Sequence, residues 1–326
     1  MIAAWYDSQG SAQDVLQLGE LPTPNPGPGE VRVRMSLSSI NPGDTKKRRG
    51  WLGSSMTYPR VVPHSDGAGL VDAVGSGVGQ SRVGERVWVF GAQSYRAFGT
   101  AAQFTVVPEW QAITLPDSVA PDVGACLGIP GITAHRAVFG DGSVVGKTVV
   151  VQGVLGGVGS LAAQLARWKG ATVIGTVRTA ADLEQARASG TDFAVALDDP
   201  NAALRVREFA GDGVDRIVEV AFSDNIDFDA AVSKNDTVIA AYGTRDDRPS
   251  LPFWPMLFDN ITIRLLGSDD FSRDAKMVAA RELTEAASAG ALSVSVDEPL
   301  PLDRIADAHD RVDAGTRSRV VLQIPE

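Results

Sequence analysis

The sequence predicts an α/β fold in which a doubly wound, parallel-sheet domain is inserted into a β-rich domain built from both ends of the chain. Short strand-like runs separated by turn residues come first, an alternation of strand-like and helix-like segments follows, and mixed structure ends the chain. The 326 residues suffice for two domains. We expect the β-rich domain to comprise 1–121 and 268–326, and the inserted domain to comprise 122–267.

The first part of the chain is typical of a mostly antiparallel sheet with few helices. Its apolar runs are short and bounded by Gly, Pro and Asn clusters, and PTPNPGPGE (22–30) can be neither helix nor central strand because prolines lack the amide donor. The predicted strands lie in 30–40, 68–78, 85–90 and 101–110.

The middle of the chain alternates between strand-like and helix-like segments. Several of the strand-like runs are apolar along their whole length, which is expected where helices cover both faces of a parallel sheet. The six predicted strands are 147–152, 171–177, 193–197, 215–220, 236–242 and 261–267. After them we expect two helices and a last strand, in 273–290, 302–315 and 318–326.

Composition excludes several classes of function. With 44% hydrophobic residues, 21% charged residues and a net charge of −10, the chain resembles an ordinary globular protein and is too acidic for a nucleic-acid or acidic-membrane partner. It shows no secretory signal and no apolar run long enough to span a bilayer. A single cysteine allows no internal disulfide, so we expect a cytoplasmic, reducing environment.

The segment VQGVLGGVG (151–159) predicts a phosphate-binding loop. Gly156, Gly157, Val158 and Gly159 lie where the first strand of the parallel sheet meets its helix, so backbone amides and the positive helix end can approach a pyrophosphate. The usual fingerprint has a glycine where Val154 stands. The alternative is that these glycines serve only a tight turn and helix packing.

The end of the second strand favours NADPH over NADH. A dinucleotide site for NADH usually has an acidic residue here, whereas an arginine accommodates the 2′-phosphate of NADPH. Thr176 and Arg178 occupy this end, and no acidic residue follows until Asp182. The alternative is that Arg178 is only a solvated loop residue.

The ends of later strands are expected to frame the rest of the cofactor, because ligands of such sheets gather at the carboxyl ends of the strands. The candidates, assigned by position alone, are Val220, Ala221, Gly243, Gly267 and Ser268.

Five motifs, in order along the whole chain, resemble the medium-chain dehydrogenase/reductase superfamily and its zinc-independent, zeta-crystallin-like quinone oxidoreductase branch. They are INPGD (40–44), PHSDGAGLVDAVGSGV (63–78), GERVW (84–88), CLGIPGITAHRAV (126–138) and VVVQGVLGGVGSLAAQLA (149–166). The resemblance implies a GroES-like catalytic domain and a Rossmann cofactor domain. It also implies a phosphate loop that begins at Gly153.

The resemblance implies chemistry without zinc. Asn41, Ser65 and Ile129 occupy the positions of the catalytic zinc ligands in zinc-dependent members, and none of them is a credible zinc ligand. Without a Lewis acid, alcohol oxidation is difficult. Reduction of a quinone or an α,β-unsaturated carbonyl compound, which is already electrophilic, is easier.

The resemblance also implies several site residues. Asn41 is expected near the nicotinamide, and the segment after it is expected to line the substrate pocket, with Asp44, Lys46 and Trp51 as candidates. Thr133 is expected to contact the nicotinamide end, and Arg319 to reach the cofactor. No catalytic acid is assigned. We expect His135, on the helix that links the domains, to be structural, with a role as proton donor as the alternative, and we assign no role to His309.

Lys46 stands where relatives often have a tyrosine, and it begins a basic run through Arg49. This run is either a solvated face or an attractor of an acidic substrate, such as a carboxylate or a coenzyme-A thioester.

We therefore expect an NADPH-dependent, zinc-independent reductase of quinones or related conjugated carbonyl compounds. The closest alternative is an enoyl or enone reductase that saturates a C=C bond beside a carbonyl or thioester. A second alternative is an NADPH-binding protein of structural or regulatory role with little turnover. The resemblance further implies a homodimer or homotetramer that pairs through the edge strand 261–267.

Overall fold

The computed structural model describes residues 1–326, which form two compact units. The first comprises Met1–Pro130, Lys276–Ser288 and Ser293–Glu326, and the second comprises Gly131–Ala275 and Ala289–Leu292. Both ends of the chain thus belong to one unit. The sequence-based boundaries after residues 121 and 267 stay predictions of where the folding domains meet.

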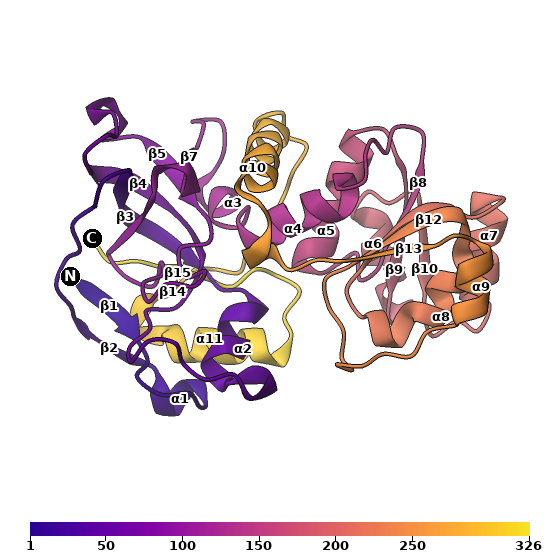
Figure 1. The fold of residues 1–326 in the computed structure, drawn as a ribbon, viewed down its shortest axis with the longest axis horizontal. Helices are drawn as coiled ribbons and strands as arrows, with labels where there is room; N and C mark the ends of the chain where they lie inside the picture. The colour runs from indigo at the N-terminus through magenta and orange to yellow at the C-terminus, as the bar shows by residue number, and fades with distance from the viewer. The chain divides into compact units, whose positions relative to one another are not determined.

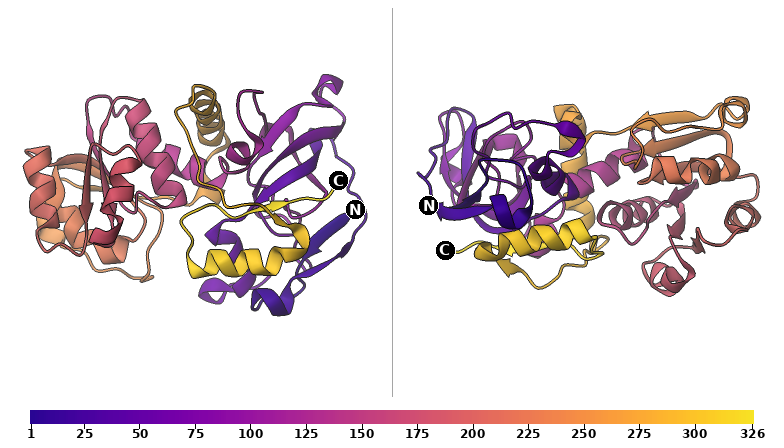
Figure 2. Two further views of the ribbon diagram at one scale, coloured as in Figure 1. Left: turned by 180° about the vertical axis from the view of Figure 1, so that it is seen from behind. Right: turned by 90° about the horizontal axis from the view of Figure 1, so that it is seen from below.

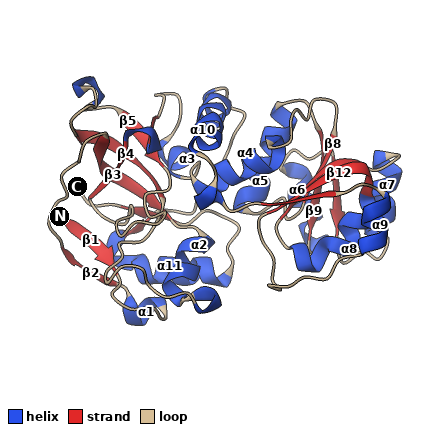
Figure 3. Cartoon of the chain, in the orientation of Figure 1, coloured by secondary structure: helices blue, strands red, loops and turns tan.

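The first unit is built on a mixed, mostly antiparallel sheet, as predicted (Figure 3). Its strand order is β14-β15-β3-β4-β5-β7, and only the β14–β15 pair is parallel. The strands are β3 (Glu30–Ser39), β4 (Asp66–Val74), β5 (Arg86–Val89), β7 (Ala112–Thr114), β14 (Leu300–Pro301) and β15 (Val321–Gln323); β6 (Phe104–Pro108) pairs with β3, and β1 (Ile2–Trp5) pairs with β2 (Gln17–Glu20).

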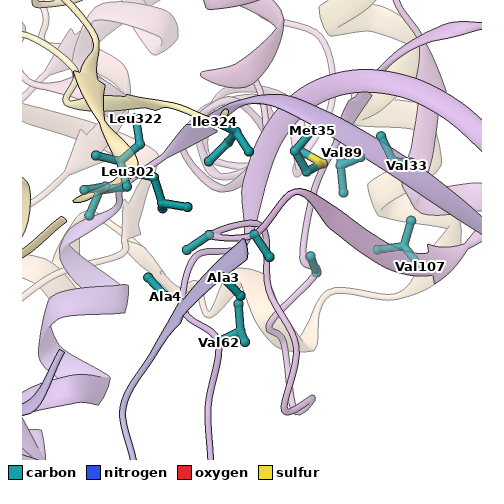
Figure 4. Close-up of a cluster of buried hydrophobic side chains, with 14 of the residues drawn as sticks. Ala3, Ala4, Val33, Met35, Val62, Val89, Val107, Leu302, Leu322 and Ile324 are labelled. Atoms are coloured by element: carbon teal, nitrogen blue, oxygen red, sulfur yellow. The ribbon is translucent and has the colours of Figure 1, made fainter. Parts of the chain in front are cut away.

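The core of the first unit joins segments from both chain ends. Figure 4 shows Leu322 and Ile324, from the last strand and the residue after it, in one apolar cluster with Val33 and Met35 of β3. Strands alternate inward apolar and outward polar residues, so this cluster excludes water on one face of the sheet. The helices α1 (Ala12–Val15), α2 (Pro42–Arg49), α3 (Pro121–Ala125) and α11 (Ile305–Ala314) complete the unit, together with most of α10 (Arg273–Ser288).

The second unit is a six-stranded, wholly parallel sheet, as predicted (Figure 1). Its order, β10-β9-β8-β11-β12-β13, places the first strand in the middle and the later strands on both sides of it, which is the doubly wound arrangement. The strands are β8 (Thr148–Val151), β9 (Thr172–Val177), β10 (Phe193–Ala196), β11 (Val214–Glu219), β12 (Ser233–Ala241) and β13 (Thr262–Leu265). The helices are most of α4 (Ile129–Phe139), α5 (Gly157–Trp168), α6 (Leu183–Ala188), α7 (Ala202–Ala210), α8 (Phe222–Val232) and α9 (Phe253–Phe258).

The register of this sheet aligns the carboxyl ends of its central strands. Val151 of β8 pairs with Gly175 of β9 and with Val218 of β11, and Glu219 pairs with Ala241 of β12. The turns that follow these strands therefore share one edge, where the order reverses and ligands of such sheets bind. Further views of the chain are given in Figure 2. Every helix is too short or too polar to cross a membrane.

Candidate cofactor and catalytic sites

The loop after β8 has the backbone that a phosphate needs. Gly153 has φ +64°, a conformation that favours glycine, and its carbonyl accepts the amide of Gly156 at 2.9 Å. A Cβ at Gly159 would lie 2.3 Å from the same carbonyl oxygen. These glycines therefore let the helix start pack directly on the loop, which agrees both with a phosphate-binding loop and with the alternative of a tight turn and helix packing.

The first amides of α5 are available to a ligand. The first hydrogen bond inside the helix runs from Ser160 to Gly156, at 2.8 Å. The amides of Gly157, Val158 and Gly159 precede it and lie at the positive end of the helix dipole. An anion placed there would accept hydrogen bonds without meeting a side chain of the loop's glycines.

Val154 fits the slot where the usual fingerprint has a glycine because its side chain points into the protein. It is fully buried, and its amide donates to the carbonyl of Thr176 at 3.1 Å. Opposite it, a Cβ at Gly175 would lie 2.9 Å from Val154 Cγ1. The space is thus supplied by a glycine on β9 instead of one in the loop.

Arg178 directly follows β9 and carries an exposed guanidinium. It makes no hydrogen bond or ion pair with the protein. In contrast, Thr176 is fully buried beneath the loop, and its hydroxyl is engaged by Gln152 and Gly153. The turn after β9 therefore offers one free cation beside the phosphate loop.

The other predicted cofactor residues lie at the same sheet edge. A Cβ at Gly243 would lie 2.4 Å from the carbonyl oxygen of Val220, so the turns after β11 and β12 approach closely only because residue 243 is glycine. The amide of Ala221 donates to the Glu219 carboxylate. Gly267 and Ser268 follow β13 by two and three residues.

A second cluster lies in the first unit, around Asn41. This residue precedes α2, whose start is set by Pro42 and by Asp44, whose carboxylate accepts the Asn41 amide at 2.8 Å. The Asn41 side chain is buried and used at both ends. Its Nδ2 donates to Asp66 Oδ2 and its Oδ1 accepts from Arg319 Nη2, each at 2.7 Å.

Asp66 and Arg319 complete this buried cluster. Arg319 Nη2 also donates to Ser39 Oγ at 2.8 Å, and Asp66 Oδ2 accepts the amide of Ile129 at 2.8 Å. Burial raises the pKa of Asp66 to about 7, in spite of the hydrogen bond from Asn41 that favours the carboxylate. The cluster can therefore hold or release a proton near neutral pH.

The zinc-ligand positions inferred from the sequence resemblance are all tied into this region. Ser65 is buried, and Asn41 and Ile129 both donate to Asp66. No three His, Cys, Asp or Glu side chains come together in a group that could hold a metal ion.

The remaining predicted pocket residues lie on the outer part of α2 and just after it. Lys46 Nζ lies 4.5 Å from the centroid of the Trp51 ring, which is half exposed. Partial burial, with the nearby charge of Arg49, lowers the pKa of Lys46. Lys46 is thus a restrained cation beside an aromatic face.

The expectation that the basic run is a solvated face is wrong for Arg48. Its side chain is fully buried and forms a salt bridge with Asp313 at 2.7 Å. Arg49 forms a second salt bridge with the same aspartate, at 3.3 Å. Arg48 Nε also donates to His309 Nδ1 at 3.3 Å. One face of α2 therefore anchors α11, and the basic run is divided between structural and exposed cations.

A buried pair of histidines escaped the sequence reasoning. His64, which precedes β4, meets His309 of α11 through their Nε2 atoms at 2.8 Å. His309 lies with Ile305 and Ala308 on the buried side of its helix, a pattern that could have signalled a core position.

Two further predicted positions lie on α4, in the second unit. Thr133 is buried, and its contact with a nicotinamide stays a prediction. His135 is buried against Phe139, with the ring centroids 5.0 Å apart, and its structural role stays a prediction.

Comparisons with known proteins agree with this architecture. The family model for the alcohol dehydrogenase GroES-like domain matches residues 27–117, and the model for zinc-binding dehydrogenases matches 157–280. A chloroplast envelope quinone oxidoreductase homolog from Arabidopsis thaliana is 30% identical over 229 residues, 68% of each chain. The chain belongs to the medium-chain dehydrogenase/reductase superfamily.

Within this superfamily, the chain is similar along nearly its whole length to quinone oxidoreductases. The Homo sapiens quinone oxidoreductase is 26% identical over 306 residues, which cover 93% of this chain and 91% of the relative. Three solved structures cover at least 99% of both chains: an NAD-dependent alcohol dehydrogenase (26% identity, TM-score 0.89), a mycobacterial protein complexed with NADPH (26%, 0.83) and a 2-haloacrylate reductase (27%, 0.84). This medium-chain dehydrogenase/reductase is accordingly an oxidoreductase of the quinone oxidoreductase-like family.

Proposed function

We propose that this protein is a zinc-independent, NADPH-dependent reductase of quinones or related α,β-unsaturated carbonyl compounds. The observation that carries the proposal is the pairing, on one sheet edge, of a glycine loop at a helix start with the unpartnered guanidinium of Arg178. A pyrophosphate suits the first and a 2′-phosphate suits the second. The names of the human and Arabidopsis relatives support the quinone substrate class.

The residues present fit the cofactor. The amides of Gly157, Val158 and Gly159 would hold the pyrophosphate, and Arg178 would hold the 2′-phosphate. Thr133, Asn41 and Arg319 stay candidates for the nicotinamide end, and Val220, Ala221, Gly243, Gly267 and Ser268 stay candidates for the rest of the binding edge. When bound, the cofactor supplies a hydride to an electrophilic carbon.

Reaction without zinc is supported by the cluster around Asn41. The side-chain amide of Asn41 donates to Asp66 and accepts from the guanidinium of Arg319. A fixed positive charge inside this cluster would repel a dication. We therefore expect purified protein to contain no stoichiometric zinc by elemental analysis, and one equivalent would contradict this part of the proposal.

An enoyl or enone reductase is the second candidate. The likeness to a 2-haloacrylate reductase supports it, because that substrate name denotes an unsaturated carboxylate. Lys46, which has no anionic partner, is a candidate to attract such a group. An NADPH-binding protein with little turnover is the remaining alternative.

A substrate panel separates these functions. Purified protein with NADPH is mixed with quinones, enones, 2-haloacrylate or enoyl thioesters, and the loss of NADPH absorbance is followed. We expect the fastest turnover with a quinone. Faster turnover of an enone or unsaturated acid would favour the second candidate, and tight NADPH binding without turnover of any acceptor would favour the third.

Cofactor preference is tested at Arg178. Arg178→Ala should weaken NADPH binding about tenfold, because one charge-assisted contact is lost, and should leave NADH binding nearly unchanged. Arg187→Ala, an exposed arginine of α6, is the matched control. The likeness to an NAD-dependent alcohol dehydrogenase makes NADH the natural comparison, and equal losses of both cofactors would refute the 2′-phosphate role.

We also propose assembly as a homodimer or homotetramer through β13. This strand is the last in its sheet, and Leu265 on it is 77% exposed. On α9, Trp254 and Phe258 stack together and are 65% and 73% exposed. Leu265→Glu should lower the molar mass measured by light scattering, whereas Leu204→Glu on α7 should not.

The single cysteine supports a cytoplasmic location.

A further inference from the structure

A chain of buried side chains lies beneath the phosphate loop of the second unit. Thr176, at the end of β9, accepts the amide of Gly153 on its Oγ1 at 3.2 Å and donates its own proton to Gln152 Oε1 at 2.5 Å. Gln152 Nε2 donates to Asp229 Oδ1 at 2.6 Å. The side chains of Thr176, Gln152 and Asp229 are all fully buried, so water does not replace these contacts.

Asp229, at the far end of this series of hydrogen bonds, shows how the Gln152 amide is oriented. Asp229 on α8 is buried near Glu219, and both burial and the charge of Glu219 raise its pKa well above the usual range. Asp229 Oδ1 accepts the amide nitrogen of Gln152, and the amide oxygen of Gln152 therefore faces Thr176. The Thr176 hydroxyl then has a single acceptor for its proton and keeps its lone pair for Gly153.

The same threonine belongs to two subsites. Its hydroxyl holds the first glycine of the phosphate loop, and its carbonyl accepts the amide of Val154 at 3.1 Å. Two residues further on, the same stretch of backbone carries Arg178. No other side chain donates to or accepts from both Gly153 and Gln152.

We propose that Thr176 and Gln152 are positioning residues that couple the phosphate loop to the turn carrying Arg178, so that one hydroxyl sets both NADPH affinity and the preference for the 2′-phosphate. This inference rests on the proposed NADPH function. Both side chains are fully buried, so we expect them to act by holding the loop and not by contacting the cofactor. Removal of the hydroxyl leaves the Gly153 amide and the Gln152 oxygen buried without partners, and the loop must move to satisfy them.

The test is calorimetric titration of the whole protein with NADPH, NADH and 2′,5′-ADP. Thr176→Val keeps the shape and removes the hydroxyl, and should weaken NADPH about tenfold while reducing the NADPH-over-NADH preference. Thr176→Ser keeps the hydroxyl and should stay within about twofold of wild type. The melting temperature without ligand is recorded for each variant.

A double-mutant cycle measures the coupling itself. In the Thr176→Val background, Arg178→Ala should cost NADPH affinity clearly less than it does in wild type, because the turn is already displaced. Additive losses would overturn the coupling. If Thr176→Val does not fold, Gln152→Met breaks the same series of hydrogen bonds one residue further from the loop, and it should weaken NADPH binding in the same way. Asp229→Asn retains the acceptor oxygen and should bind NADPH with normal affinity.

The outcomes are distinguishable from failure of the proposed function. Suppose that the wild-type protein binds NADPH. Equal NADPH affinity of Thr176→Val and wild type would then overturn this inference alone, and so would equal losses of affinity in Thr176→Val and Thr176→Ser. A wild-type protein that binds none of the three nucleotides overturns the cofactor proposal together with it.

Discussion

The imidazole rings of His64 and His309 share a hydrogen bond, with their Nε2 atoms 2.8 Å apart. Arg48 donates to His309 Nδ1, so the His309 proton lies on Nε2 and is donated to His64. The His64 proton then lies on Nδ1 and is donated to Ser38 Oγ at 2.8 Å. Each ring is neutral and has one defined tautomer.

Acid should destabilise the first unit through this pair. Burial lowers the pKa of His64 from 6.5 to about 3, and burial with the neighbouring cation Arg48 lowers the pKa of His309. A depressed folded-state pKa gives stability that is present above the unfolded value and lost as pH falls through the folded value. The free energy of unfolding, measured with urea, should therefore fall from pH 6.5 toward about pH 3.

The double variant His64→Gln/His309→Gln provides the comparison for this acid effect. It should be less stable at neutral pH and lose less stability on acidification, whereas His135→Gln should follow wild type. Identical acid profiles for the double variant and wild type would show that other groups dominate.

Arg48→Met should reduce the free energy of unfolding by about 2–3 kcal/mol, because it leaves His309 Nδ1 and Asp313 without their buried partner. Arg49→Met removes the more exposed arginine that binds the same aspartate, and should cost less than about 1 kcal/mol. Denaturant unfolding of both variants measures the difference. Equal costs would mean that burial of Arg48 contributes little.

Gly159→Ala should weaken NADPH binding more than tenfold, since the added Cβ would lie 2.3 Å from the Gly153 carbonyl oxygen and push α5 away from the loop. Fluorescence titration with NADPH measures the loss. Gly79→Ala is a suitable control because its nearest neighbour, Ser81 Oγ, lies 3.5 Å away. Normal affinity in Gly159→Ala would argue against a tight helix–loop contact.

A rise in pH should destabilise the second unit through Asp229. A carboxyl group whose folded pKa is raised gives stability that is complete below the unfolded value of 3.8 and lost as pH rises through the folded value. Asp229→Asn mimics the neutral acid and should flatten this decline with rising pH, measured by urea unfolding. A decline of the same size in the variant would place its origin elsewhere.

The parallel sheet and the glycine-rich loop before α5 could be predicted because their signals are local. Each central strand is apolar along its length, and the glycines around Gly156 adjoin one of them. The link from Asn41 to Arg319 and the pair of His64 with His309 could not be predicted, since each joins residues far apart in sequence through packing that no local pattern encodes. The prediction of a solvated Arg48 was wrong for the same reason. Its sequence neighbours are cationic, and only the tertiary structure places Asp313 beside it.

The closing of the Asn41 cluster by Arg319 has a consequence for synthesis of the chain. On the ribosome, Asn41 and Asp66 emerge long before their cationic partner, and the core around Val33 lacks Leu322 and Ile324 until residue 324 has been synthesised. The strands of the inserted sheet all lie between residues 148 and 265, so this sheet does not need residues 319–324 to form. The second unit should therefore be able to fold before the first unit, which is complete only once residues 319–324 have left the ribosome.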